Sequence, residues 1–147
     1  MKSGETLIVG FIGIFVLLVA VSGCYSNSNE KVLGVYHFST TNNNPVNDKY
    51  VELPTGTRNL KIECSNMTSL SGTDSYFQFT TYNIVPQEGQ ALNDYEVVID
   101  RQVISLNSTS PLTGTITLYT NNAKSIGIRA SNATGTIKVI INFKGIY

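Results

Sequence analysis

The sequence predicts an all-β domain built as an antiparallel β-sandwich of about eight strands, preceded by an N-terminal hydrophobic helix. From residue 33 onward, apolar and polar residues alternate in short segments, as they do in strands with one buried face. Gly, Pro, Asn, Asp and Ser separate these segments, which is typical of turns between strands. A long apolar run occurs only near the N-terminus, so we expect a hydrophobic helix there.

The N-terminal segment has the composition of an export signal. Lys2 precedes 15 uncharged residues, Leu7–Val21. This length fits the apolar region of a signal peptide and falls short of the roughly 20 residues that a membrane-spanning helix needs. We expect residues 1–23 to be a signal peptide or membrane anchor, residues 24–31 to be a polar tether, and residues 32–147 to be the β-sandwich domain.

The apolar run ends in a short motif that suggests a lipid anchor. Val21, Ser22, Gly23 and Cys24 resemble the lipobox of exported lipoproteins, in which an aliphatic residue and two small residues precede a cysteine. With the Ser- and Asn-rich stretch that follows, the segment is similar to archaeal surface lipoproteins of the methanogen type. The resemblance implies that Cys24 carries a lipid, and that the domain lies at the outer face of the cell membrane.

Two alternatives remain open for this segment. In the first, it stays uncleaved and acts as a single N-terminal anchor. In the second, Gly4 followed by Glu5 resembles type IV pilin and archaellin precursors, which implies cleavage after Gly4 and a filament or envelope subunit. Such helices usually continue well past the membrane, whereas the polar residues Ser26–Asn29 end the apolar pattern here.

The alternating segments define the expected strands. They are Val32–Phe38, Lys49–Leu53, Asn59–Ser65, Ser75–Ile84, Asp94–Leu106, Thr113–Thr120, Lys124–Ala130 and Thr136–Lys144. Strands with one apolar face each can bury those faces only against one another, which favours two packed sheets with a jelly-roll or immunoglobulin-like topology. The connections Thr40–Asp48 and Pro86–Asn93 are long enough to carry a binding site.

The phase of the alternation predicts which side chains form the core. They are Leu60, Ile62, Cys64, Phe77, Phe79, Val97, Ile99, Ile116, Leu118, Ile126, Ile128, Ile137, Val139, Ile141 and Phe143. Cys64 is therefore expected to be a buried thiol that behaves as a small apolar side chain. A disulfide between Cys64 and Cys24 cannot form if Cys24 is lipidated.

One strand presents a candidate ligand face. Phe77 and Phe79 are expected to face the core, which places Tyr76, Gln78 and Tyr82 on the opposite side. Exposed tyrosines can stack on sugar rings, as in carbohydrate-binding modules. The alternative is that tyrosine is simply a good strand former on a solvated face.

The sequence lacks the residues that common active sites need. His37 is the sole histidine, and no nucleophile elbow Gly-x-Ser-x-Gly is present. One histidine and one free cysteine cannot supply the four ligands of a zinc site. Glu96 and Asp100 are two carboxylates on one predicted strand face, the minimum for glycoside hydrolysis, but Arg101 follows them and such pairs are usually solvated. We expect no enzymatic activity, no metal and no cofactor.

Net charge and short sequence motifs limit the kinds of partner that the chain can bind. Lys plus Arg and Asp plus Glu each number 10, and no basic run is present, which argues against nucleic-acid binding. Asn66, Asn107 and Asn132 begin N-glycosylation sequons at expected strand ends or turns. The sequence therefore favours a membrane-anchored surface β-sandwich with a non-enzymatic binding or structural role. Its expected partners are the membrane and either a surface glycan or another envelope protein.

Overall fold

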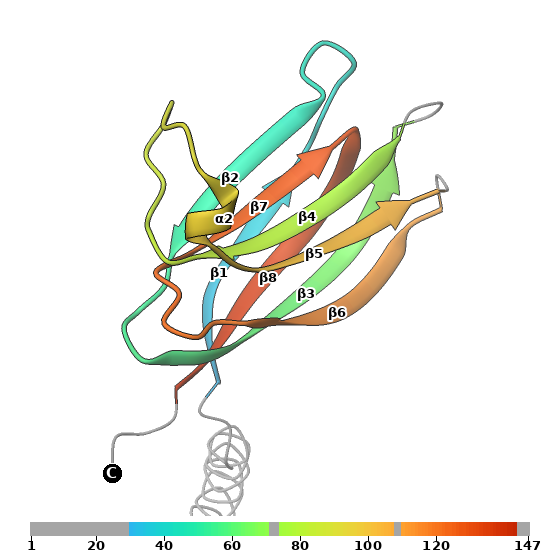
Figure 1. The fold of residues 1–147 in the computed structure, drawn as a ribbon. Helices are drawn as coiled ribbons and strands as arrows, with labels where there is room; N and C mark the ends of the chain where they lie inside the picture. The colour runs from blue at the N-terminus through green and yellow to red at the C-terminus, as the bar shows by residue number, and fades with distance from the viewer. Residues whose placement is uncertain (1–29, 71–73, 108–109, 144–147) are drawn as a thin grey trace, which may run out of the picture.

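The computed structural model describes residues 30–70, 74–107 and 110–143, and the side chains within them except that of Phe143 (Figure 1). The predicted N-terminal hydrophobic helix, the lipobox residues and Cys24 lie outside the described residues. Within the described ranges, none of the helical structure is long and apolar enough to cross a membrane.

Strands make up nearly all of the regular secondary structure in the described residues. The elements are β1 (Glu30–Phe38), β2 (Val46–Glu52), β3 (Thr57–Ser69), β4 (Ser75–Tyr82), the short helix α2 (Asp94–Val97), β5 (Val98–Leu106), β6 (Leu112–Tyr119), β7 (Ser125–Ser131) and β8 (Ala133–Phe143). The all-β prediction is confirmed, and each predicted strand overlaps an observed one, although Asp94–Val97 of the predicted Asp94–Leu106 strand form α2 instead. Residues 30 and 31 were expected in the tether, but they belong to β1 because Glu30 and Lys31 pair with Asn142 and Ile141 of β8.

The strands form two antiparallel four-stranded sheets that pack face to face (Figure 1). One sheet has the order β1-β8-β3-β6, and the other has the order β2-β7-β4-β5. Only β4 and β5 follow each other within a sheet, while every other connection between consecutive strands crosses from one sheet to the other. This connectivity is that of a jelly roll, one of the two topologies that the sequence left open.

The core lies between the sheets and is centred on aromatic side chains of β4. Phe77 and Phe79 are fully buried and stack with their ring centroids 6.3 Å apart. The ring of Phe38 from β1 meets Phe77 edge-on, with the centroids 5.9 Å apart, and so joins the two sheets. Because neighbours along a strand point to opposite faces, Gln78, which lies between Phe77 and Phe79, must face outward.

Most of the predicted core is confirmed. The buried members are Leu60, Ile62, Cys64, Phe77, Phe79, Leu118, Ile126, Ile128, Ile137, Val139 and Ile141. Ile99 and Ile116 pack against the core but are only partly buried, because they lie on the edge strands β5 and β6. Val97 is half-buried in α2, where strand alternation does not apply. The prediction did not include Phe38, Val51, Leu53, Met67 and Leu106, which are also buried.

Candidate functional site

The outer face of the β2-β7-β4-β5 sheet carries polar and aromatic side chains in aligned rows. Residues that pair across strands share a face, so the register determines which side chains meet. One row contains Asp48, Arg129 and Gln78, and the next contains Tyr50, Gly127, Thr80 and Arg101. These residues come from all four strands of the sheet, β2, β7, β4 and β5, so together the rows run from one edge of the sheet to the other.

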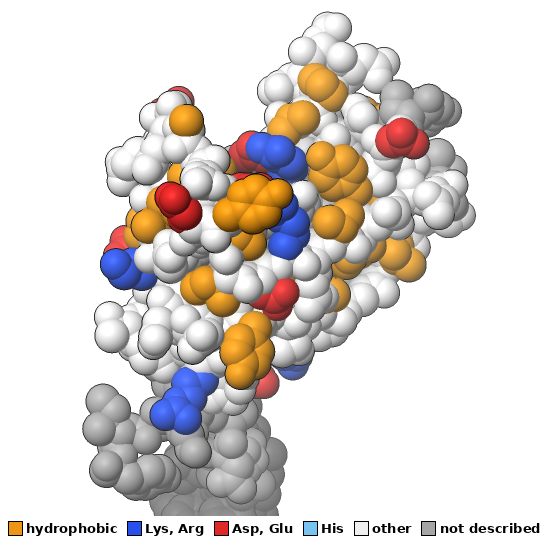
Figure 2. All heavy atoms as spheres, in the orientation of Figure 1, with side chains coloured by type: hydrophobic (Ala, Val, Ile, Leu, Met, Phe, Trp, Pro, Cys, Tyr) orange, Lys and Arg blue, Asp and Glu red, His pale blue; other side chains and the backbone are white. Residues whose placement is uncertain are grey.

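A groove of about 340 Å³ lies over these rows. Its second wall is the connection between β4 and β5, residues 83–97, which crosses in front of the sheet and includes α2 (Figure 1). Gln90, Leu92 and Asp94 of this connection line the groove. The groove is within the range of ligand pockets, about 300 to 1,000 Å³. Figure 2 shows acidic, basic and apolar side chains close together on this face.

Two tyrosines close over a glycine at the floor of the groove. Tyr50 of β2 and Tyr82 of β4 meet edge to face, with ring centroids 5.9 Å apart. A Cβ atom at Gly127 would lie 2.8 Å from Tyr82 and 2.9 Å from Tyr50, closer than side chains tolerate. Glycine therefore allows both rings to pack against the β7 backbone. Tyr82 is 6% exposed and Tyr50 is 40% exposed, so of the two tyrosines only Tyr50 is open to solvent.

Asp48 and Arg129 form a two-point ion pair in the groove. Arg129 donates from Nε to Asp48 Oδ1 and from Nη2 to Asp48 Oδ2, each at 2.7 Å. The paired carboxylate raises the pKa of Arg129, so the guanidinium stays charged. The side chain of Arg129 remains 43% exposed and that of Asp48 remains 32% exposed, so both are open to solvent.

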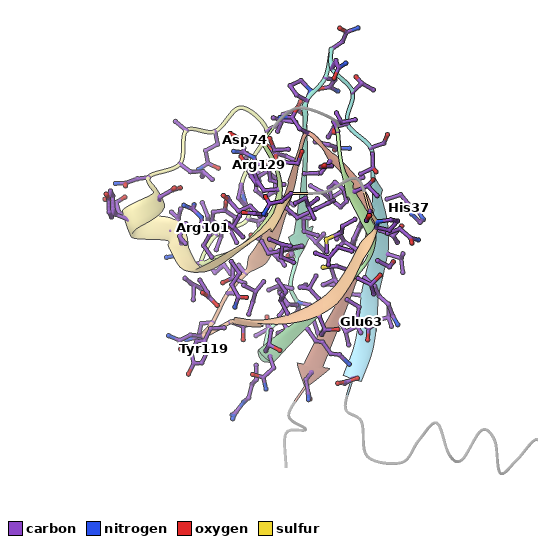
Figure 3. The ribbon with its side chains drawn as sticks, turned by 90° about the vertical axis from the view of Figure 1, so that its right-hand side faces the viewer. His37, Glu63, Asp74, Arg101, Tyr119 and Arg129 are labelled. Atoms are coloured by element: carbon purple, nitrogen blue, oxygen red, sulfur yellow. The ribbon has the colours of Figure 1, made fainter. Side chains whose placement is uncertain are left out.

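A second ion pair attaches the 83–97 connection to the sheet. Arg101 of β5 donates from Nη2 to Asp94 Oδ2 at 2.8 Å and from Nε to Thr80 Oγ1 at 3.4 Å. At the base of the connection, the Asn83 backbone N–H donates to the Val97 carbonyl at 2.9 Å. The side chains of Arg101 and Arg129 lie on the side of the sandwich that carries α2, while His37 and Glu63 lie on the opposite side (Figure 3).

The predicted ligand face coincides in part with this groove. Gln78 and Tyr82 line it, as does Thr80 between them. Tyr76 lies one row further along β4, half-buried, and does not line the groove. Tyr82 was expected to be exposed, but it is buried at the end of the sheet where the 83–97 connection crosses.

Four important lining residues were not predicted: Asp48, Tyr50, Arg101 and Arg129. Their alternation along β2, β5 and β7 was visible in the sequence. These four residues line one groove only because of the order and register of strands that are far apart in the chain. Alternation within each segment does not indicate that order or register. Asp48 was also expected in a loop, but β2 begins two residues earlier, at Val46.

The carboxylate pair considered for hydrolysis does not assemble. Residues 94–97 form a helical turn rather than the start of a strand, which breaks the predicted phase. Glu96 is therefore exposed on α2. Asp100 Oδ2 instead accepts a hydrogen bond at 2.9 Å from the backbone N–H of Tyr119, on the edge of the other sheet. The prediction that Glu96 and Asp100 share one strand face was wrong.

The other candidate residues lie elsewhere. His37 is exposed on the opposite sheet, with its Nδ1 atom 2.9 Å from Thr136 Oγ1. Cys64 is a free thiol, 1% exposed, and burial raises its pKa to about 12. Among the described residues, no group of three His, Cys, Asp or Glu side chains is arranged to hold a metal ion.

The three sequon asparagines occupy different settings. Asn107 is exposed directly after β5. Asn66 is exposed but lies inside β3, at a bulge where its φ is 53°, rather than at a strand end. Asn132 links β7 to β8, and its side-chain amide donates to the Asp74 carbonyl at 2.9 Å, so its nitrogen is already engaged.

In the described residues, fold and groove together define an eight-stranded β-sandwich with a polar groove on one outer face. No protein-family model matches the chain, and no curated protein matches it in sequence. A solved structure of a carbohydrate-binding module, described as "CBM4 structure and function", is similar with a TM-score of 0.40 and 13% identity over 82% of this chain and 83% of that one. A second, described as "Bacillus endospore appendages form a novel family of disulfide-linked pili", has a TM-score of 0.36 and 7% identity over 78% and 88%. Both likenesses are remote.

Proposed function

We propose that this chain is a non-enzymatic surface protein that binds a glycan in the groove on the β2-β7-β4-β5 sheet. The observation that supports this proposal best is the half-exposed ring of Tyr50 beside charged and amide side chains at fixed positions. A sugar ring has an apolar face and a rim of hydroxyls. It therefore suits a site that offers an aromatic ring together with hydrogen-bond donors and acceptors.

The character of the lining favours a glycan over a peptide. Gln78 and the two ion pairs supply donors and acceptors, while Thr80 is buried beneath them and accepts from Gln78 and Arg101. Leu92 is a half-buried apolar member of the lining, while Ile128 is fully buried and points to the core. A peptide that gains affinity from apolar side chains would find few partners here.

The cellular location of the chain is part of the same proposal. The lipobox-like residues Val21–Cys24 support export and a lipid on Cys24, which would hold the domain at the outer face of the membrane. β1 begins at Glu30, six residues after Cys24, and six extended residues reach about 20 Å. A lipid on Cys24 would therefore keep the groove close to the cell surface, where glycans are abundant.

The decisive variant is Tyr50→Ala, which removes the exposed ring and leaves the buried Tyr82 in place. We expect it to lower glycan affinity about two- to tenfold, since stacking on an aromatic ring contributes about 0.5 to 1.5 kcal/mol. The measurement is binding of the full-length chain, in a detergent without sugar groups, to an array of oligosaccharides, followed by calorimetric titration of those that bind.

Tyr119→Ala is the matched control, because Tyr119 is a tyrosine on β6 that is 70% exposed and lies outside the groove. It should bind like the wild type. The proposal fails if no oligosaccharide binds, or if both tyrosine variants bind equally well.

A further inference from the structure

The charged residues that line the groove balance one another. They are two arginines and two aspartates, Arg101, Arg129, Asp48 and Asp94, and each arginine is within 2.8 Å of an aspartate oxygen. The groove therefore holds no formal net charge. A carboxylate or sulfate group on a ligand would find its arginine already neutralised, and an aspartate next to it would repel it.

The same pairs suit hydroxyl groups. A guanidinium has five N–H donors, of which Arg129 gives two to Asp48, and each carboxylate oxygen has more than one acceptor position. A hydroxyl donates one hydrogen bond and accepts others, so adjacent hydroxyls on a sugar can donate to Asp48 and accept from Arg129 at once. An anionic group can use only the donors.

The lining also indicates the length of the ligand. Tyr50 lies on β2, at one edge of the sheet, and Arg101 lies on β5, at the other edge. Strands in a sheet are about 4.8 Å apart, so the groove spans roughly 14 Å across the strands. A single sugar ring would leave one of the two ion pairs uncontacted, whereas a short chain of sugars would reach both.

We infer that the ligand is an uncharged oligosaccharide that lies across the four strands, and that the Asp48–Arg129 pair selects it over acidic glycans. This inference rests on the proposed glycan-binding function. The specificity-determining residue is Asp48, because its carboxylate both accepts from sugar hydroxyls and neutralises Arg129.

Salt dependence and one variant test the inference. In the wild type we expect neutral hexose oligosaccharides to bind and uronic-acid oligosaccharides to bind at least about tenfold more weakly. Affinity for the neutral ligand should change less than about twofold between roughly 0.02 M and 0.5 M salt, because screening acts on net charge. Asp48→Asn leaves Arg129 without its counter-charge, so affinity for acidic oligosaccharides should rise about fivefold or more and become sensitive to salt.

Glu63→Gln is the control for this variant, since it removes one negative charge from the opposite sheet, where Glu63 pairs with Lys61 and Lys138. It should leave the preference unchanged. Salt-sensitive preference of the wild type for acidic oligosaccharides, with Tyr50→Ala still defective, would overturn the inference and leave the glycan-binding proposal intact. Absence of binding to either class would overturn both.

Discussion

The buried thiol of Cys64 predicts a measurable loss of stability at alkaline pH. Cys64 is 1% exposed on β3, and burial raises its pKa from 9.0 to about 12. Below pH 9.0 the thiol is protonated in both the folded and the unfolded chain. Between these two pKa values only the unfolded chain releases the proton, so this contribution to stability is lost as the pH rises from 9.0 toward 12. At about pH 10.5 the loss reaches roughly 2 kcal/mol.

The assay compares urea unfolding of the full-length wild type with that of Cys64→Ala across pH. At about pH 7 the variant should be less stable by about 1 kcal/mol, because it loses a few buried contacts. At about pH 10.5 the order should reverse, since alanine does not ionise and tyrosine and lysine titrations affect both proteins alike. Parallel pH profiles, or rapid alkylation of Cys64 in the folded wild type, would refute the argument.

Three further predictions concern the groove and the anchor. Gly127→Ala should displace the ring of Tyr50, lower the free energy of unfolding by about 1 to 3 kcal/mol and weaken glycan binding; unchanged binding would contradict the packing described. On β4, Phe79→Ala should lower the free energy of unfolding by about 3 to 5 kcal/mol, as urea unfolding would show. Gln78→Ala should lower it by under about 0.5 kcal/mol but weaken glycan binding, as calorimetric titration would show. Cys24→Ser should abolish the diacylglyceryl mass on the mature N-terminus and leave the unfolding midpoint unchanged; a mature N-terminus at Glu5 would instead support a filament subunit.

The strands could be predicted because their signal is local. In the middle of β3 and β8, residues such as Leu60, Ile62 and Val139 alternate with lysine and glutamate, and their alternation predicts which of them are buried. The same rule failed at Asp94–Val97, where apolar and acidic residues also alternate. There the backbone N–H groups of Glu96 and Val97 bond to the Asn93 carbonyl and close a helical turn, so the phase of the strand starts anew at Val98.

The groove could be predicted only in part, for a related reason. Gln78 and Tyr82 follow from the phase of β4 alone. Tyr50 and Arg129 join them only because β2 and β7 pair in a register that places Tyr50 opposite Gly127 and Asp48 opposite Arg129. This pairing joins segments about 80 residues apart in sequence, and alternation within each segment does not indicate its partner.

The alternation that builds the sandwich also separates the residues that stabilise it from the surface proposed to bind a glycan. On β4, Phe77 and Phe79 fill the core while Gln78 between them lies in the groove, and on β7, Ile126 and Ile128 flank Gly127 in the same way. A fully packed inner face holds the strands in register, so the outer side chains are positioned without having to support the core. Substitutions at exposed outer positions such as Gln78 should therefore cost little stability, provided that Gly127 keeps the space in which the two tyrosine rings meet.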